Sequence, residues 1–226
     1  MDILSTDILS ADILSTGILP AGLEVKIPAE AGIAFAPRET GSTFLENALI
    51  KADELHRLLA EKGILRGGEA VIADDSGICV DALGGRPGIH SAYYAGSAAA
   101  GGRGLNAAPS PVPSAAEQNA LLLEELGDNP RRSARFVCAM VLYYSGERFF
   151  AAQETLEGEI VKSLPQGQGG FGYDPVLYLP ELGRTVAELS AEEKNRLSHR
   201  GKAGRVIAGL LSRERLLGAT QAGKCR

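Results

Sequence analysis

The sequence predicts a single domain of the α/β class, and three observations support this. The chain has 226 residues, of which 45% are hydrophobic, so it can bury one sizeable core. Extended apolar runs at 70–73, 135–144 and 148–155 alternate with helical patterns. A Ser or Thr followed three residues later by Glu, the capping-box signature, begins three of these helices: Thr43 with Glu46, Ser114 with Glu117, and Ser190 with Glu193. Strands and helices that mix along one chain favour an α/β sandwich.

The N-terminal segment is a short internal repeat in which the unit Asp-Ile-Leu-Ser occurs three times within residues 1–18. A unit of about five residues is too short to build a solenoid, so we interpret the segment as low-complexity sequence. At most one copy is expected to form a strand, as the remnant of a first strand. A strand at 23–27 follows. We expect the folded domain to span residues 19–217 and residues 218–226 to be a tail.

The rest of the chain predicts an insertion, a hairpin and two more helices. Residues 97–114 are rich in Gly, Ala, Pro and Ser, which indicates a flexible surface insertion. One helix begins after Ser114. The runs 135–144 and 148–155 flank a Ser-Gly turn and predict a hairpin. The third capping box predicts one continuous helix with a basic face, which carries Lys194, Arg196, His199, Arg200, Lys202 and Arg205.

Composition excludes several classes of protein. The formal net charge of −5 argues against binding of nucleic acid through overall charge, so a phosphate ligand would need a local basic cluster or a metal. The three cysteines, Cys79, Cys138 and Cys225, have no C-x-x-C spacing, which indicates neither a disulfide framework nor a zinc site and favours the cytoplasm. No apolar run of about 18 residues and no basic N-terminus occur, so we expect no membrane association.

The first chemically informative segment is Asp74-Asp75-Ser76-Gly77, which follows the predicted strand at 70–73. Between Glu69 and Gly85 there are four acidic residues and no Lys or Arg, so these adjacent carboxylates have no cation nearby in the sequence. A divalent cation such as Mg²⁺, which binds carboxylate oxygens, would supply the missing charge. A simple turn is the alternative, because Asp, Ser and Gly are common turn residues.

The second segment surrounds Phe171 with glycines and continues into Tyr173-Asp174-Pro175. Glycines beside an aromatic residue let the backbone approach a flat ligand while the ring offers a stacking face. The alternative is a Gly-rich bulge whose Phe171 and Tyr173 belong to the core. Asp174, in a tight turn before proline, would need a partner if it is buried.

The third segment is the basic run from Glu193 to Ala203. On one helix, Lys194, Ser198, His199 and Arg200 would converge as hydrogen-bond donors. Such donors suit phosphate oxygens or a carbonyl group on a base. A solvated charged face is the alternative, since most charge runs have no other role.

These three segments follow the run Glu39–Ala52 in one order, and together they resemble the inosine triphosphate pyrophosphatase family. The family is also called the Ham1 or RdgB-like nucleoside triphosphate pyrophosphatases. The resemblance covers about residues 19–208, apart from the insertion, and includes the run Asp81–Gly88. It implies an elongated α/β/α fold with a mixed sheet, two lobes and a central cleft, and a homodimer. It also implies Mg²⁺-dependent hydrolysis of ITP, dITP and XTP to the nucleoside monophosphate and pyrophosphate.

The resemblance also implies roles for individual residues. Asp75 would be the proton acceptor and a metal ligand, with Asp74 and Glu39 supporting the metal. Donors on the basic segment would select a 6-oxo purine over adenine. The substrate-binding residues implied are Lys51 and Ser76 for the phosphates, Phe171, Gly172, Tyr173 and Asp174 for the wall against the base, and Lys194, His199 and Arg200 for the base itself.

Two departures from the family pattern concern the phosphate end. Family members have a first strand followed by a Thr/Ser-Gly-Asn-x-x-Lys loop, whereas Gly17 here is followed by Ile-Leu-Pro. The family's Ser-Ala-Arg-Tyr motif corresponds here to residues 91–94, in which Tyr93 stands in place of the Arg. Loss of phosphate-binding cations reduces transition-state stabilisation. A catalytically weakened protein that binds ITP without turnover is therefore an alternative. Another is a phosphatase that uses Asp74 or Asp75 as nucleophile and releases inorganic phosphate.

Overall fold

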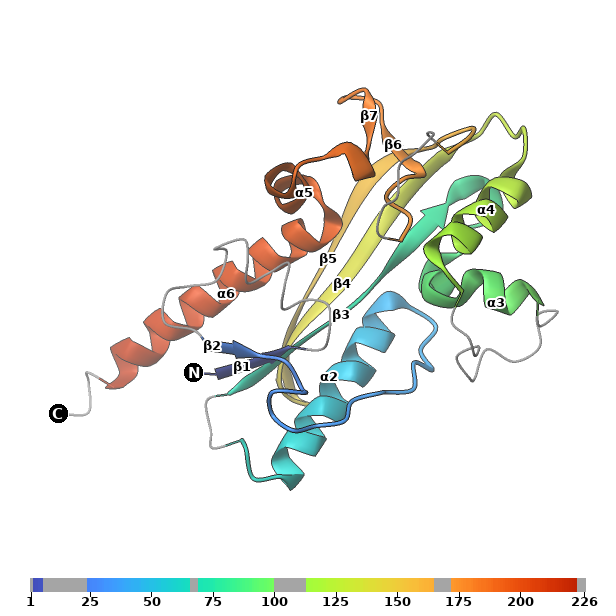
Figure 1. The fold of residues 1–226 in the computed structure, drawn as a ribbon. Helices are drawn as coiled ribbons and strands as arrows, with labels where there is room; N and C mark the ends of the chain where they lie inside the picture. Colours follow the sequence, from blue (N-terminus) through green and yellow to red (C-terminus); the bar gives the residue numbers. More distant parts are fainter. Residues whose placement is uncertain (1, 6–23, 66–68, 100–112, 165–171, 223–226) are drawn as a thin grey trace.

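The fold is built on one mixed sheet of seven strands in the order β2-β1-β3-β4-β5-β6-β7 (Figure 1). The computed structural model describes residues 2–5, 24–65, 69–99, 113–164 and 172–222. Strand β1 runs parallel to both of its neighbours, and the remaining pairs are antiparallel. The strands are β1 (Asp2–Ser5), β2 (Glu24–Lys26), β3 (Ala70–Val80), β4 (Ser133–Ser145), β5 (Arg148–Ile160), β6 (Leu177–Leu179) and β7 (Arg184–Thr185).

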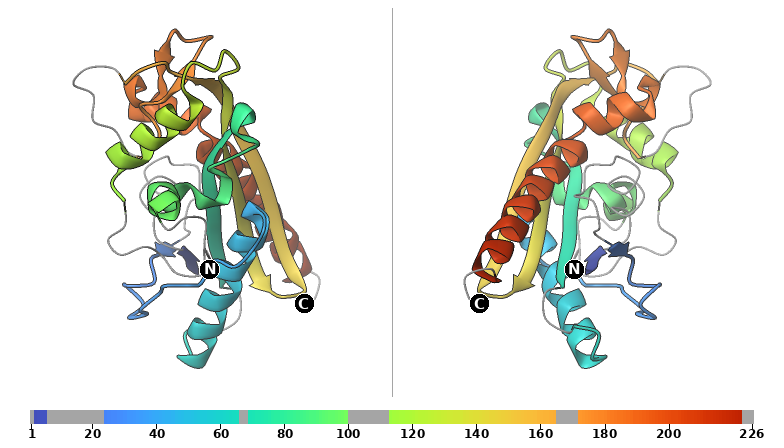
Figure 2. Two further views of the ribbon diagram at one scale, coloured as in Figure 1. Left: turned by 90° about the vertical axis from the view of Figure 1, so that its right-hand side faces the viewer. Right: turned by 90° about the vertical axis from the view of Figure 1, so that its left-hand side faces the viewer.

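Helices cover both faces of this sheet, which makes three layers (Figure 2). On one face, Ala48 and Leu55 of α2 pack against Val141 of β4. On the other face, Ile207 of α6 packs against Met140 of β4. The helices are α2 (Phe44–Glu61), α3 (Tyr94–Ala99), α4 (Ala115–Leu126), α5 (Ala191–Leu197) and α6 (His199–Ala222), with short 3-10 turns η1 (Asp81–Leu83), η2 (Gly88–Tyr93) and η3 (Val186–Glu188). The predicted α/β class with a mixed sheet is confirmed, whereas the central cleft stays a prediction.

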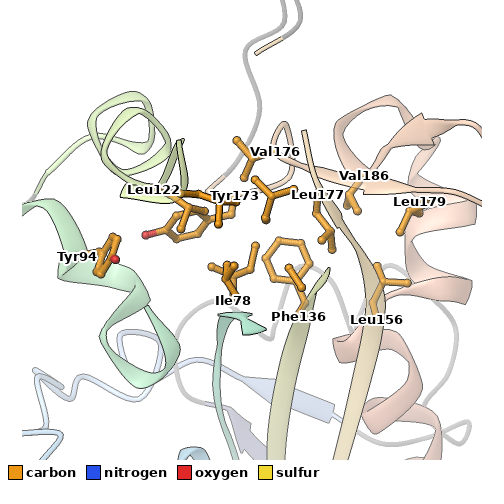
Figure 3. Packing of buried hydrophobic residues seen from close by; sticks show 14 residues of the cluster. Ile78, Tyr94, Leu122, Phe136, Leu156, Tyr173, Val176, Leu177, Leu179 and Val186 are labelled. Atoms are coloured by element: carbon orange, nitrogen blue, oxygen red, sulfur yellow. The ribbon is translucent and has the colours of Figure 1, made fainter. Parts of the chain in front are cut away.

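One end of the long strands carries a separate hydrophobic cluster (Figure 3). Ile78 of β3 and Phe136 of β4 contribute to it, and Leu122 of α4 packs against them. Tyr173 and Val176 add the segment that leads into β6. Because burial of each large side chain contributes roughly 1.5–3 kcal/mol, this cluster fixes the segment around Tyr173 against the sheet.

The long strand β3 departs from the sequence prediction. Residues 74–77 were expected to end a strand or form a turn, but β3 runs without interruption from Ala70 to Val80. The ladder with β4 explains this, because Asp74 pairs with Met140 and the pairing continues to Val80. Backbone hydrogen bonds to β4 therefore override the local turn preference of Asp, Ser and Gly. Neighbouring side chains along this segment must point to opposite faces of the sheet.

The prediction of one continuous helix near the C-terminus is also wrong. It divides into α5 and α6 at Ser198, whose ψ of 154° is extended. The hydroxyl oxygen of Ser198 accepts a hydrogen bond from the backbone N–H of Gly201 at 3.0 Å, so Ser198 acts as the cap that begins α6. The break separates Lys194 on α5 from His199 and Arg200 on α6.

Several predicted boundaries change as well. The first copy of the N-terminal repeat forms β1, between β2 and β3, and the other copies lie outside the described residues. Residues 97–99 of the expected insertion form the end of α3, and residues 100–112 lie outside the described residues. Helix α6 includes residues 218–222 of the expected tail.

Other predicted elements are present as expected. The hairpin and the capping boxes at Ser114 and Ser190 are confirmed. Within the described ranges, no helix is long and apolar enough to cross a membrane.

Candidate active site

The loop before α2 and the first turns of that helix form one side of the site. Asn47 and Lys51 are four residues apart on α2, so they lie on the same face of the helix. The Oδ1 atom of Asn47 accepts a hydrogen bond from the backbone N–H of Gly41 at 2.8 Å. A Cβ at residue 41 would lie 2.7 Å from that same Oδ1 atom, so this close approach requires glycine. Asn47 thereby holds the loop that carries Glu39 against the helix.

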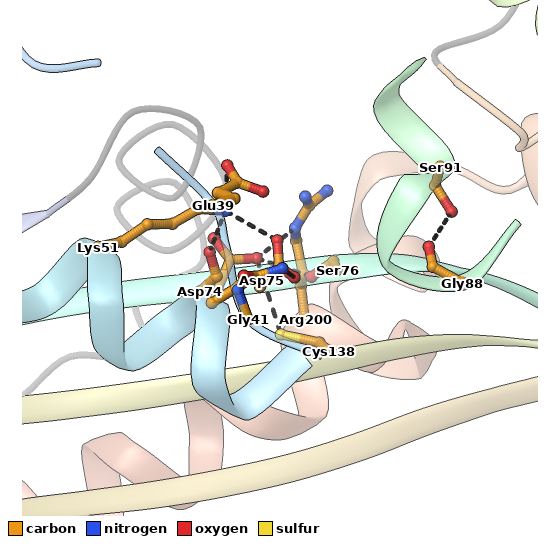
Figure 4. Close-up of polar contacts among 11 residues, drawn as sticks. Glu39, Gly41, Lys51, Asp74, Asp75, Ser76, Gly88, Ser91, Cys138 and Arg200 are labelled. Atoms are coloured by element: carbon orange, nitrogen blue, oxygen red, sulfur yellow. Dashed lines mark hydrogen bonds and ion pairs between the residues drawn. The ribbon is translucent and has the colours of Figure 1, made fainter. Parts of the chain in front are cut away.

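Glu39, Lys51 and Asp75 meet at this loop (Figure 4). The Nζ atom of Lys51 lies 2.8 Å from Oδ1 of Asp75 and 3.0 Å from Oε1 of Glu39. The Nδ2 group of Asn47 donates to Oδ2 of Asp75 at 3.1 Å. Asp75 is 6% exposed and comes from the middle of β3. The structure thus brings three of the predicted site residues together around one ammonium group.

The electrostatics of this cluster suit a carboxylate that accepts protons. Burial raises the pKa of Asp75 above its ordinary value, and the nearby ammonium of Lys51 opposes that shift. For Lys51, burial works to lower the pKa, but the charges of Asp75 and Glu39 outweigh it and raise the pKa. Lys51 is therefore protonated at neutral pH. A carboxyl pKa that is raised toward neutrality is the direction a general base needs.

The same carboxylates supply the donors that a hard divalent cation prefers. Glu39 and Asp75 each direct one oxygen atom at the ammonium of Lys51, so two carboxylates already converge on one positive charge. Among the described residues, no group of three or more His, Cys, Asp or Glu side chains gathers as in a closed metal site. Mg²⁺ usually binds one or two carboxylates together with waters and substrate phosphates. The donor set therefore fits Mg²⁺ that is held jointly by protein and polyphosphate.

Asp74 lies on the opposite face of the sheet from Asp75. Its Oδ2 atom accepts from the hydroxyl of Ser76 at 2.7 Å and from Nε of Arg200 at 3.0 Å. The thiol of Cys138, on the neighbouring strand, lies 3.8 Å from the same oxygen. The structure thus joins the predicted residues Asp74, Ser76 and Arg200, but it does not bring the Asp74 carboxylate to Glu39. Only the backbone oxygen of Asp74 contacts Lys51, at 3.2 Å.

The segment Gly172–Asp174 is held between α4 and α5. Asp174 is 8% exposed, and its Oδ2 atom lies 2.6 Å from Nζ of Lys194, so the partner expected for a buried Asp174 is present. Gly172 adopts a φ of 57°, which favours glycine. The hydroxyl of Tyr173 donates to the backbone oxygen of Ser91 at 2.9 Å, and its ring packs in the hydrophobic cluster of Figure 3. Phe171 lies outside the described residues.

His199 is buried at the start of α6. Its ring stacks on Phe136 with centroids 4.8 Å apart and an interplanar angle of 15°. Burial, reinforced by the positive charge of Arg200, lowers the pKa of His199 to about 3, so the imidazole is neutral. The prediction that His199 contacts a base stays a prediction.

The structure adds residues that sequence reasoning did not single out. Asn47 binds both Asp75 and the loop at Gly41, and its buried amide on the apolar face of α2 was the available signal. On α4, Gln118 binds the Tyr173 hydroxyl at 3.0 Å, and Asn119 donates to the backbone oxygen of Gly172 at 3.0 Å. Their long-range partners could not be read from local spacing.

Comparisons with known proteins place these observations in one family. Residues 11–209 match the sequence model of the Ham1 family. A dITP/XTP pyrophosphatase from Treponema denticola is 44% identical over 182 residues, which are 79% of this chain and 82% of the relative. One with the same name from Geobacillus kaustophilus is 46% identical over 80% of this chain and 79% of its own length.

Solved structures agree with the sequence matches. The Ham1 protein of Staphylococcus aureus superposes with a TM-score of 0.77 at 33% identity, covering 95% of this chain and 100% of that protein. A nucleoside-triphosphatase described as a dITP/XTP pyrophosphatase, from Mycobacterium abscessus, gives a TM-score of 0.64 at 35% identity, covering 93% of this chain and 99% of that one.

Proposed function

The chain belongs to the Ham1 family, and from this membership and the geometry of its site we propose that it hydrolyses non-standard purine nucleoside triphosphates. The substrates would be ITP, dITP and XTP, and the products the nucleoside monophosphate and pyrophosphate. Such an activity removes deaminated purines from the nucleotide pool. The observation that carries the proposal is the convergence of Glu39 and Asp75 on the ammonium of Lys51.

Asp75 is the proton acceptor in this proposal. Its carboxylate takes a proton from a water molecule, whose oxygen forms a bond to the α-phosphorus while the bond from that phosphorus to the bridging oxygen breaks. The electron pair of the broken bond leaves with pyrophosphate. The amide of Asn47 holds the carboxylate in position through the hydrogen bond to Oδ2. Lys51, as a buried cation at the same place, binds phosphate oxygens.

We propose that Glu39 and Asp75 also hold Mg²⁺. When bound, the ion would neutralise charge on the triphosphate and on the departing pyrophosphate. The carboxylate of Asp74 is directed to the other face of the sheet, so the set proposed for the metal is Glu39 and Asp75.

The base would be recognised by Lys194 and Arg200. Both are donors without acceptors, so they match the carbonyl oxygen of a 6-oxo purine and oppose the 6-amino group of adenine. The ion pair with Asp174 fixes the ammonium of Lys194 beside the segment Gly172–Asp174. This arrangement supports the discrimination between deaminated and ordinary purines.

We also propose that the protein is a cytoplasmic homodimer. The dimer rests on the family resemblance. The location is supported by the free thiols of Cys79 and Cys138, which suit a reducing compartment. Sedimentation at several concentrations tests the dimer, since a single monomeric species at micromolar concentration would contradict it.

Product analysis tests the proposed activity. The protein with Mg²⁺ should release pyrophosphate from ITP, dITP and XTP, much less from ATP, and none after chelation of Mg²⁺. Asp75→Asn should lower the rate by about 10²–10⁴-fold with the fold intact, because the amide accepts no proton. Asp128→Asn, at an exposed position after α4, is the matched control. Binding of ITP without turnover would indicate the nucleotide-binding alternative, and inorganic phosphate as the first product would indicate a phosphatase.

A further inference from the structure

Two adjacent carboxylates on β3 have different partners. Asp75 faces α2 and contacts Lys51, while Asp74 faces α6 and contacts Arg200. Both are almost completely buried, with exposed fractions of 6% and 7%. Because strand residues alternate between faces, one continuous strand presents one carboxylate to each side of the sheet. The pair therefore connects two parts of the site that lie on different elements.

The carboxylate of Asp74 makes its hydrogen bonds on the face of the sheet that α6 covers. Its Oδ2 atom accepts from the Ser76 hydroxyl and from Nε of Arg200. Burial works to raise the pKa of Asp74, but Arg200, Ser76 and Lys51 outweigh it and lower the pKa. The carboxylate is thus an ion that accepts a charge-assisted hydrogen bond from a guanidinium, which is roughly twice as strong as a hydrogen bond between neutral groups.

Arg200 is placed by the junction between α5 and α6. A Cβ at Gly201 would lie 1.8 Å from the backbone oxygen of Asn195, so the two helices meet there in backbone contact. Ser198 caps α6 in the same place. The junction brings the backbone of Arg200 to a fixed position, and the hydrogen bond from Nε to Asp74 then sets the direction of the side chain. Figure 4 shows its two terminal nitrogen atoms pointing away from Asp74.

We propose that Asp74 is a positioning residue for Arg200 and not a metal ligand. This inference rests on the proposed function, in which Arg200 binds the base. Asp74 holds the guanidinium by Nε so that the terminal nitrogen atoms face the substrate. It also ties this donor to the backbone of Asp75, the residue that would handle the α-phosphate. Because Asp74 and Asp75 are adjacent in β3, the contact of Asp74 with Arg200 fixes how far the base-binding guanidinium lies from the carboxylate that acts at the α-phosphate.

A double-mutant cycle with Asp74→Asn and Arg200→Gln tests the coupling. Each single change should lower kcat/KM for ITP by about 10- to 100-fold, mainly through KM, and should lower the preference for ITP over ATP about tenfold. The double variant should be no worse than the more severe single variant, within about threefold. Arg213→Gln, an exposed arginine on the same helix, is the matched control.

Mg²⁺ binding separates positioning from metal ligation. In calorimetric titration with Mg²⁺ at a saturating concentration of a non-hydrolysable ITP analogue, Asp74→Asn should bind Mg²⁺ like the unmodified protein, whereas Asp75→Asn should lose binding. Loss of Mg²⁺ binding in Asp74→Asn, effects that multiply in the double variant, or an unchanged ITP preference would each overturn the proposal. If Asp74→Asn does not fold, Asp74→Glu carries the test, because its longer side chain keeps the charge but displaces the guanidinium of Arg200; KM and base preference should then change while Mg²⁺ binding does not.

The outcome also separates this inference from the proposed function. If the unmodified protein releases no pyrophosphate, the proposed function fails. The double-mutant cycle would then use dissociation constants for ITP. A double variant that binds ITP no more weakly than the weaker single variant supports the positioning role, and losses of affinity that multiply contradict it.

Discussion

Replacing Lys51 by methionine removes the cation on which Glu39 and Asp75 converge. Methionine has a similar length and no charge, so two carboxylates would face each other without compensation. The side chain of Asp75 is 7% exposed and that of Glu39 is 31% exposed. Removing one partner of a buried ion pair costs about 3–5 kcal/mol, and the partial exposure of Glu39 places the expectation at the lower end.

We therefore expect Lys51→Met to lose about 3 kcal/mol of unfolding free energy at pH 8 without divalent cations. For a chain of this size that corresponds to a fall in Tm of about 6–12 °C. The folded-state pKa of Asp75 is raised above 3.8, so its contribution to stability is full below that pH and is lost as pH rises through the folded pKa. Without the ammonium that pKa should rise further, so the deficit of the variant should grow from about pH 4 to pH 8.

The assay is thermal unfolding with and without millimolar Mg²⁺. Because Mg²⁺ supplies the charge that Lys51 supplied, it should raise the Tm of Lys51→Met more than that of the unmodified protein. Lys162→Met, at an exposed site after β5, is the control and should change Tm little. An unchanged Tm in Lys51→Met at pH 8, or equal stabilisation of both proteins by Mg²⁺, would refute the reasoning.

Three further predictions concern the scaffold. Arg132 donates from its buried guanidinium to four backbone carbonyl oxygens, so Arg132→Met should cost about 3 kcal/mol in denaturant unfolding, while exposed Arg131→Met should stay within about 0.5 kcal/mol. Gly201→Ala should lower Tm because its Cβ would overlap a carbonyl oxygen of α5, whereas Gly209→Ala, with open space on α6, should gain up to about 1 kcal/mol. The pKa of His199 falls from 6.5 to about 3 on folding, so its contribution is present above pH 6.5 and is lost as pH falls. His199→Phe should keep its stability between pH 6.5 and pH 4 better than the unmodified protein, and equal pH profiles would contradict this.

Local signals were sufficient for much of the fold. The capping boxes at Ser114 and Ser190 begin helices where they were expected, because cap hydrogen bonds are formed within four residues. The hairpin of β4 and β5 was also visible, since its strands are adjacent in sequence. The break at Ser198 was missed because capping at Ser198 competes with continuation of the helix, and the basic pattern runs through both helices.

The sequence predicted which residues belong to the candidate site better than it predicted which side chains contact one another. Asp75, Lys51 and Glu39 were expected near one another and are in contact. The adjacent Asp74 was assigned to the same metal group from the family resemblance and because neither carboxylate has a cation nearby in the sequence. A continuous strand separates them, and that continuity depends on pairing with β4, more than 60 residues along the chain. Sequence spacing holds no information on a contact such as that of Asp74 with Arg200.

The most direct test of the central claim follows oxygen from the solvent during hydrolysis of ITP. In water labelled with ¹⁸O, attack at the α-phosphorus places the label in inosine monophosphate and leaves pyrophosphate unlabelled. Asp75→Asn should form neither product at a comparable rate, while Asp128→Asn should label as the unmodified protein does. Label in pyrophosphate or in inorganic phosphate would contradict the account, because the water would then have attacked a different phosphorus atom.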